Sequence, residues 1–152
     1  RHTFAPETLP ARQVGRLEVA LPMEKLFTSD AERKGAFVHY ELRDARTKAL
    51  ITELTDYAAR TKELRLPRTK AGDFTLKTTR RAGTLFIDIQ SKMLLKDAYI
   101  DLGETGWQLS DNFLDILPGR RYRLRATRRQ NSPARTTTAL PTVTLRSITT
   151  AE

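Results

Sequence analysis

Three carboxylates in the second half of the chain are of the residue type that acts as general acid and base. Asp111 and Asp115 lie close together, and Glu104 shortly precedes them. Glycosidases use two carboxylates at set separations for such chemistry. However, Asp111 and Asp115 lie in a turn-rich stretch, where Asp is favoured because its side chain hydrogen-bonds nearby backbone groups. No histidine and no further carboxylate cluster supports them, so no catalytic residue is expected in this chain.

The single tryptophan, Trp107, lies in a glycine-containing, loop-like stretch. A tryptophan in a loop can stack on a sugar ring or on a neighbouring domain, and it can equally fold back on its own domain. The sequence favours packing within or between domains. Trp107, Asp111 and Asn112 are therefore the candidate residues for contact with a sugar or with another domain.

Six arginines form a stripe in the second half: Arg120, Arg121, Arg123, Arg125, Arg128 and Arg129. Such a stripe could bind phosphate groups with salt-dependent affinity. The alternative is the solvent face of an amphipathic strand, at a sheet edge that charge protects. Nucleic-acid sites usually add stacking aromatics, and the one aromatic here, Tyr122, alternates onto the apolar side. The pattern favours a solvent face, and nucleic acid is not the expected partner.

Metal and cofactor chemistry have little support in the sequence. The chain has no cysteine and two histidines, His2 and His39, which lie far apart. His39 alternates with Val38, Tyr40 and Leu42, so it is expected on the polar side of a strand as a half-exposed histidine. No glycine-rich phosphate loop is present. We therefore expect no metal site and no cofactor.

Length and composition limit the architecture that must position these residues. The chain has 152 residues, too few for a (β/α)₈ barrel, and 30% of them are charged, as in an ordinary globular protein. No apolar run approaches the ~20 residues needed to span a bilayer, so a membrane is not an expected partner. The chain begins at Arg1 with no apolar leader in its first 20 residues. We expect a piece of a longer protein, with any targeting signal outside it.

The net charge of +9 is unevenly distributed. Residues 1–59 contain nine basic and nine acidic residues, whereas residues 60–152 contain 18 basic and nine acidic ones. The change coincides with a stretch at 60–72 that contains a proline and a glycine and few apolar residues. Such a composition is typical of a linker. The sequence therefore predicts a domain boundary at about residues 66–72.

The region after this boundary shows a period of two. Apolar and polar residues alternate in runs at 74–79, 85–90, 98–102, 121–126 and 143–146, with turns between them. This pattern predicts six or seven short strands, each with one buried face. We expect an all-β fold, a small antiparallel sandwich of immunoglobulin-like architecture.

The first half predicts fewer elements. Residues 17–21 and 36–42 alternate like strands, and so does 49–59, with a turn at 43–46. Residues 23–27 could form one helical turn, and 28–30 a loop. Three strands cannot close a sandwich. This half is therefore expected to be part of a second β-sandwich.

A resemblance enters with the segment from Trp107 to Arg120. Its core, Ser110-Asp111-Asn112-Phe113-Leu114-Asp115-Ile116-Leu117-Pro118-Gly119, resembles the Ser-Asp-Asn-x-Phe-Asp-Leu-Leu-Pro-Gly segment of the last immunoglobulin-like domain in β-mannosidases of glycoside hydrolase family 2. Leu114 replaces an aromatic and Ile116 a leucine. Residues 57–67 are similar to the connection between that family's last two sandwich domains, although Thr61 replaces a proline. Residues 143–148 are similar to its closing strand.

The resemblance covers about residues 36–150 and implies a specific whole. Residues 1–66 would be the C-terminal part of a penultimate immunoglobulin-like or carbohydrate-binding-like sandwich, and 67–152 the C-terminal immunoglobulin-like domain. Such enzymes remove terminal β-D-mannose from non-reducing ends by retaining chemistry, with both catalytic glutamates in a central barrel. No residue of this chain matches those motifs, so the expected role is non-catalytic domain packing.

The resemblance also implies partners and a compartment. The partners would be the remaining domains of the parent glycosidase and, through Trp107, mannosides. A periplasmic or secreted bacterial location is favoured, and a cytoplasmic one stays open. The alternative function, from the Arg stripe, is a basic module that binds a polyanion such as nucleic acid.

Overall fold

The computed structural model describes residues 23–129 and 140–150. The chain divides into two compact units, Arg1–Arg65 and Leu66–Glu152. In the first unit the described elements are α1 (Met23–Leu26), α2 (Asp30–Gly35), β1 (Phe37–Arg43), β2 (Leu50–Tyr57) and the 3₁₀ helix η1 (Thr61–Glu63). The predicted strand at 17–21 lies outside the described residues.

Helix α2 follows the predicted helical turn and was not expected from the sequence. Ser29 caps it: the Ser29 side chain accepts a hydrogen bond from the Glu32 backbone, and Glu32 accepts one from the Ser29 backbone. This reciprocal capping box stabilises the first turn of a helix. None of its residues is buried, so the helix carries no apolar stripe. The prediction of a loop at 28–30 was therefore wrong at Asp30, where the helix begins.

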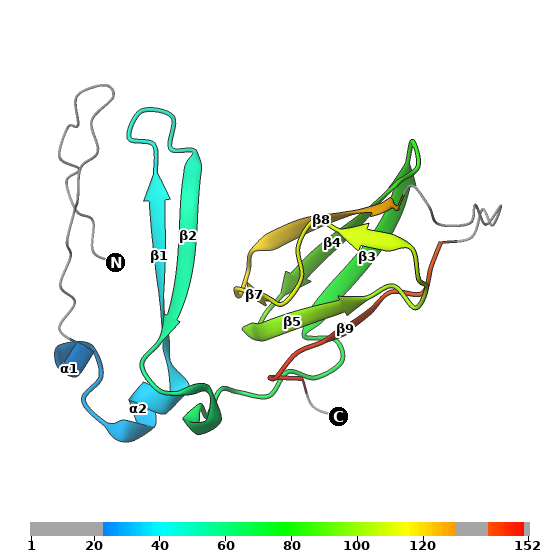
Figure 1. The fold of residues 1–152 in the computed structure, drawn as a ribbon. Coiled ribbons are helices and arrows are strands. Elements are labelled where there is room, and N and C mark those ends of the chain that lie inside the picture. The colour runs from blue at the N-terminus through cyan, green and yellow to red at the C-terminus, as the bar shows by residue number, and fades with distance from the viewer. Residues whose placement is uncertain (1–22, 130–139, 151–152) are drawn as a thin grey trace. The chain divides into compact units, whose positions relative to one another are not determined.

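Strands β1 and β2 form an antiparallel hairpin, which confirms the two strands predicted at 36–42 and 49–59 (Figure 1). The pairing runs from Phe37 opposite Tyr57 to Arg43 opposite Leu50, with an irregularity between Leu42 and Arg43. Asp44 organises the turn, because its carboxylate accepts hydrogen bonds from the backbones of Arg46 and Thr47.

Around its middle, the hairpin has a polar side and a more apolar side. Alternation places His39 and Glu41 on one side, together with their partners Thr55 and Glu53. The opposite side carries Tyr40, Leu42 and Leu54, which are exposed in the described structure rather than buried in a core.

The second unit contains seven strands among its described residues, in agreement with the six or seven predicted. They are β3 (Phe74–Arg81), β4 (Thr84–Ser91), β5 (Leu95–Asp101), β6 (Trp107–Leu109), β7 (Leu114–Ile116), β8 (Arg121–Arg128) and β9 (Thr144–Arg146). Alternation of buried and exposed residues is clearest in β4 and β8. Every strand pair is antiparallel.

These strands form two sheets, ordered β3-β4-β8-β6 and β7-β5-β9 (Figure 1). The apolar residues of both sheets form one buried cluster: Leu85, Ile87, Ile89, Leu124 and Ala126 from the first sheet, and Leu95, Ala98, Ile100 and Ile116 from the second. Two antiparallel sheets that share one core make a β-sandwich. The predicted all-β, immunoglobulin-like fold is confirmed.

The predicted linker is partly ordered against this sandwich. Thr69 is 1% exposed, its backbone N–H donates to the Thr149 carbonyl, and it forms a parallel bridge with Thr150. These backbone contacts hold Thr69 against the C-terminal residues Thr149 and Thr150 of the same unit.

Candidate functional site

The family-like segment connects the two sheets of the sandwich. Ser110 contacts β8, because the backbone N–H of Arg125 donates a hydrogen bond to the Ser110 hydroxyl at 3.0 Å. Asn112, two residues later, contacts β5. The Ile100 N–H donates to Asn112 Oδ1 at 2.8 Å, and Asn112 Nδ2 donates to the Ile100 carbonyl at 3.1 Å. An amide side chain thereby replaces a strand partner. The Ser-Asp-Asn motif works as a connection between sheets.

The end of the segment is fixed by a second set of backbone contacts. Gly119 has a φ of 74° and its N–H donates to the Ser91 carbonyl. Tyr122, half-buried on β8, accepts a hydrogen bond from the Leu117 backbone at 3.2 Å. A tyrosine near the start of a strand that bonds backbone a few residues upstream is the tyrosine corner of immunoglobulin-like sandwiches. The sequence predicted a core position for Tyr122 but not this bond.

The three candidate carboxylates do not converge. Asp115 Oδ1 accepts the backbone N–H of Asp97, a residue at φ 50° where the β5 ladder is irregular. Glu104 pairs with Arg128 at 3.1 Å. Asp111 is exposed and accepts a hydrogen bond from the Asn112 backbone. Each carboxylate therefore has its own local hydrogen-bond or ion-pair role.

Trp107 is the first residue of strand β6, so the prediction that it lies in a loop was wrong. Its ring packs against the core cluster. The Arg128 guanidinium lies over the ring at 4.6 Å from the centroid, and that of Arg80 at 5.8 Å, both within cation–π range. The indole Nε1 is buried and has no hydrogen-bond partner among the described residues. The ring is thus largely engaged within its own domain.

An exposed aromatic pair lies beside this segment and was not singled out from the sequence. Phe113 is 66% exposed and Tyr99 38%, and their ring centroids are 5.0 Å apart. Phe113 has a φ of 56°, which is rare for a bulky residue. The signal that could have found the pair is the polar-side position of Tyr99 in its strand, together with the position of Phe113 after a turn motif.

Three arginines of the stripe, Arg121, Arg123 and Arg125, lie on the solvent face of β8, as the sequence favoured, whereas Arg128 alternates onto the opposite face, over the Trp107 ring. The stripe's expected position at a sheet edge was wrong, because β8 pairs with β4 on one side and β6 on the other. Arg123 makes two hydrogen bonds to the Asp88 carboxylate, at 2.7 and 2.9 Å. This contact, with smaller effects of Arg121 and Lys77, lowers the pKa of Asp88 below its ordinary value of 3.8.

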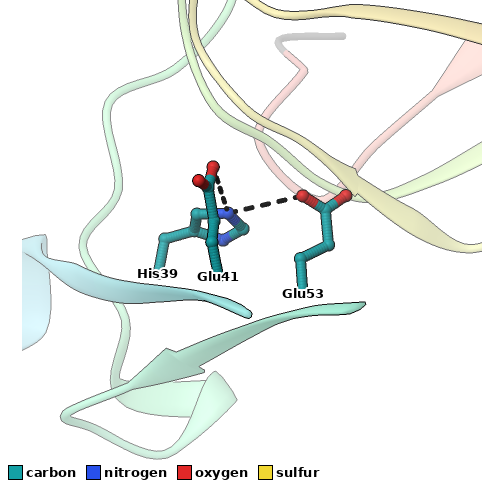
Figure 2. Close-up of side chains that lie close together, drawn as sticks. All are labelled: His39, Glu41 and Glu53. Atoms are coloured by element: carbon teal, nitrogen blue, oxygen red, sulfur yellow. Dashed lines mark ion pairs between the residues drawn. The ribbon is translucent and has the colours of Figure 1, made fainter. Parts of the chain in front are cut away.

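A different cluster forms on the hairpin of the first unit, where β-pairing brings His39 near Glu41 and Glu53 (Figure 2). His39 Nε2 lies 3.5 Å from a carboxylate oxygen of each glutamate. On the other side of the ring, Nδ1 lies 3.2 Å from the Thr55 hydroxyl. The sequence could not indicate this cluster, because Glu53 reaches His39 only through the cross-strand register.

The model of the Ig_mannosidase family, an Ig-fold domain, matches residues 66–151. The chain belongs to this family. The matched range coincides with the sandwich unit. The resemblance to the immunoglobulin-like region of β-mannosidases is thereby confirmed.

Among solved structures, the Ig_mannosidase chain is similar to the crystal structure of the β-D-mannosidase from Dictyoglomus thermophilum. The TM-score is 0.56 at 18% identity, and the match covers 78% of this chain but 14% of that one. At this identity the likeness supports the fold alone. No curated protein matches significantly. Among the described residues, no helix has the length and apolar character needed to cross a membrane.

Proposed function

We propose that this chain is a non-catalytic accessory region of a β-mannosidase-like glycosidase, and that its Ig-like domain acts by packing against the other domains of that enzyme. The parent enzyme would remove terminal β-D-mannose from non-reducing ends by retaining chemistry. The family match and the fold likeness support the relationship. The three candidate carboxylates, Glu104, Asp111 and Asp115, each have a separate local partner, which is in keeping with chemistry located elsewhere.

The observation that carries the packing role is the exposed pair of Tyr99 and Phe113. Asn112 is anchored to Ile100, and its Oδ1 also accepts the Phe113 N–H at 3.1 Å. This arrangement holds Phe113 at positive φ, which costs free energy, while leaving the ring 66% exposed. A strained backbone that presents an aromatic ring to solvent is well explained by a partner surface, since aromatics are favoured at interfaces.

The other candidate residues take supporting parts in this proposal. Asp111, exposed beside Phe113, would contact the neighbouring domain directly. Asn112 would position the surface through its hydrogen bonds to Ile100, and Trp107 would pack within the domain core. A direct sugar contact by Trp107 has less support, because Arg128 already lies over its ring.

The packing role is tested in the full polypeptide that carries this chain and in the chain alone. Phe113→Ser should lower the melting temperature of the full polypeptide by several degrees and leave that of the chain nearly unchanged. Arg125→Ser, an exposed change on the other sheet, is the matched control and should alter neither. An equal response of both proteins to Phe113→Ser would count against packing.

Catalysis and sugar binding are tested on the chain alone. It should not hydrolyse an aryl β-mannoside, and manno-oligosaccharides should not change its tryptophan emission. Measurable turnover by a clean preparation would overturn the non-catalytic role, and a saturable emission change would point to a sugar site at Trp107.

The exposed side chains of Arg121, Arg125 and Lys77 favour the second candidate function, a polyanion-binding module. That function requires retention on heparin with a steep salt dependence. We expect weak retention, because Asp88 engages Arg123 and Glu104 engages Arg128. Retention abolished by Arg121→Ser with Arg125→Ser would favour the alternative instead.

A further inference from the structure

We propose that His39, Glu41 and Glu53 form a binding site for a divalent zinc-class cation on the β1–β2 hairpin. One imidazole nitrogen and one oxygen from each carboxylate all lie within 4.8 Å of one another. In Figure 2, His39 and Glu41 project from one strand and Glu53 from its neighbour, and both carboxylates approach the imidazole ring. This site is independent of the packing role proposed for the sandwich unit.

The two nitrogen–oxygen separations fit tetrahedral zinc. Zinc binds imidazole nitrogen and carboxylate oxygen at about 2.0–2.2 Å, so neighbouring ligand atoms in a tetrahedron lie about 3.3–3.5 Å apart. His39 Nε2 lies 3.5 Å from Glu41 Oε1 and 3.5 Å from Glu53 Oε2. A direct N–H···O hydrogen bond is shorter, at about 2.7–3.2 Å. The spacing therefore suits an ion held between the three atoms.

Surrounding contacts orient two of the ligands. The Thr55 hydroxyl lies 3.2 Å from His39 Nδ1, and by accepting the Nδ1 proton it would leave the Nε2 lone pair directed at the metal. Arg43 Nε donates to Glu41 Oε2 at 2.7 Å, while the other oxygen, Oε1, is the one that lies near His39 Nε2. Metal-binding histidines and carboxylates commonly have such second contacts.

The ligand set indicates the class of ion. One imidazole with two carboxylates suits zinc or a similar transition ion, whereas calcium takes six to eight oxygens. The carboxylates balance the charge of the ion, and a water molecule would complete four ligands. The side chains of His39, Glu41 and Glu53 are 16%, 23% and 32% exposed, so the site is partly shielded but reachable from solvent.

Zinc titration by calorimetry of the tag-free, chelator-treated chain tests the proposal. We expect one zinc per chain with a micromolar dissociation constant. Glu41→Gln and Glu53→Gln should each weaken binding at least about tenfold, and His39→Ala should abolish it. Zinc should also shift the imidazole signals of His39 in NMR spectra, while a large excess of magnesium should not displace it.

Two control variants separate this site from adventitious binding. Asp56→Asn changes a carboxylate on the opposite side of the same strand, and His2→Ala removes the other histidine of the chain. Both should bind zinc like the unmodified chain. If circular dichroism shows that His39→Ala does not fold, zinc binding by Glu41→Gln and Glu53→Gln tests the proposal instead. No binding at millimolar zinc, unaltered binding in both Gln variants, loss in His2→Ala or displacement by magnesium would each overturn the proposal.

Discussion

The Asn112 side chain makes the hydrogen bonds that a neighbouring strand would otherwise make. Its amide makes two hydrogen bonds to the backbone of Ile100 and so completes the edge of β5 at the point where the chain passes between sheets. Ile100 is 1% exposed. At the residue scale the Ser-Asp-Asn motif is therefore explained by the fold, because buried backbone groups must find partners.

Replacing Asn112 by Ala should destabilise the sandwich by about 1–3 kcal/mol, since the Ile100 backbone groups lose both partners. Urea unfolding followed by Trp107 fluorescence measures the loss. Asp111→Asn is the matched control, because it keeps an acceptor oxygen at an exposed site, and it should cost less than about 0.5 kcal/mol. Equal costs for the two variants would contradict this account of the motif.

The contact between Asp88 and Arg123 predicts a pH dependence. Because the pKa of Asp88 is lowered in the folded state, its contribution to stability is present above its ordinary pKa of 3.8 and is lost as pH falls through the lower folded value. Arg123 is 61% exposed, so the effect is small.

The urea midpoint of Asp88→Asn should lie slightly below that of the unmodified chain near neutral pH, and the two should converge below pH 3.8. Arg123→Gln should behave in the same way, and combining both changes should add little. A midpoint difference that stays constant through the acid range would mean that this pair does not couple stability to pH.

At the element scale, the β3–β4 hairpin contains an unfavourable turn residue. Arg81 pairs with Thr84, which leaves a two-residue loop of Ala82 and Gly83 with φ of 45° and 78°. Two positive φ values define the type I′ turn, which favours Asn-Gly. Alanine lacks the side chain that makes this conformation tolerable for asparagine.

Ala82→Asn should therefore stabilise the sandwich by about 0.5–1 kcal/mol. Denaturant unfolding provides the measurement. Ala71→Asn, at an exposed turn position without positive φ, should give no gain. The interpretation of the turn would be wrong if both substitutions had the same effect.

Strands with a clear period of two were predictable from the sequence, because alternation follows directly from one buried face. β4, with Leu85, Ile87 and Ile89, is the clearest example. Helix α2 was missed because it has no apolar stripe. Its main sequence signal is the capping box at Ser29 and Glu32. The position of β8 inside its sheet and the approach of Glu53 to His39 depend on strand order and register. Pairing between sequence-distant strands, as for β8, has no local signature, and the register of the β1–β2 hairpin depends on the geometry of its turn.

At the scale of the whole molecule, the second unit is an Ig-fold sandwich. Its core is apolar, its family motif makes backbone contacts, and Glu104, Asp111 and Asp115 each have a different partner. The exposed pair of Tyr99 and Phe113 is a feature that the fold alone does not explain. Our central claim is that other domains of a β-mannosidase-like enzyme cover this pair.

Hydroxyl-radical footprinting with mass spectrometry tests that claim most directly. Phe113 and Tyr99 should be readily oxidised in the isolated chain and several-fold less so in the full polypeptide, while Phe86, beside Arg123 on the other sheet, should react alike in both. If Phe113 is oxidised at the same rate in the full polypeptide and in the isolated chain, the packing role is contradicted.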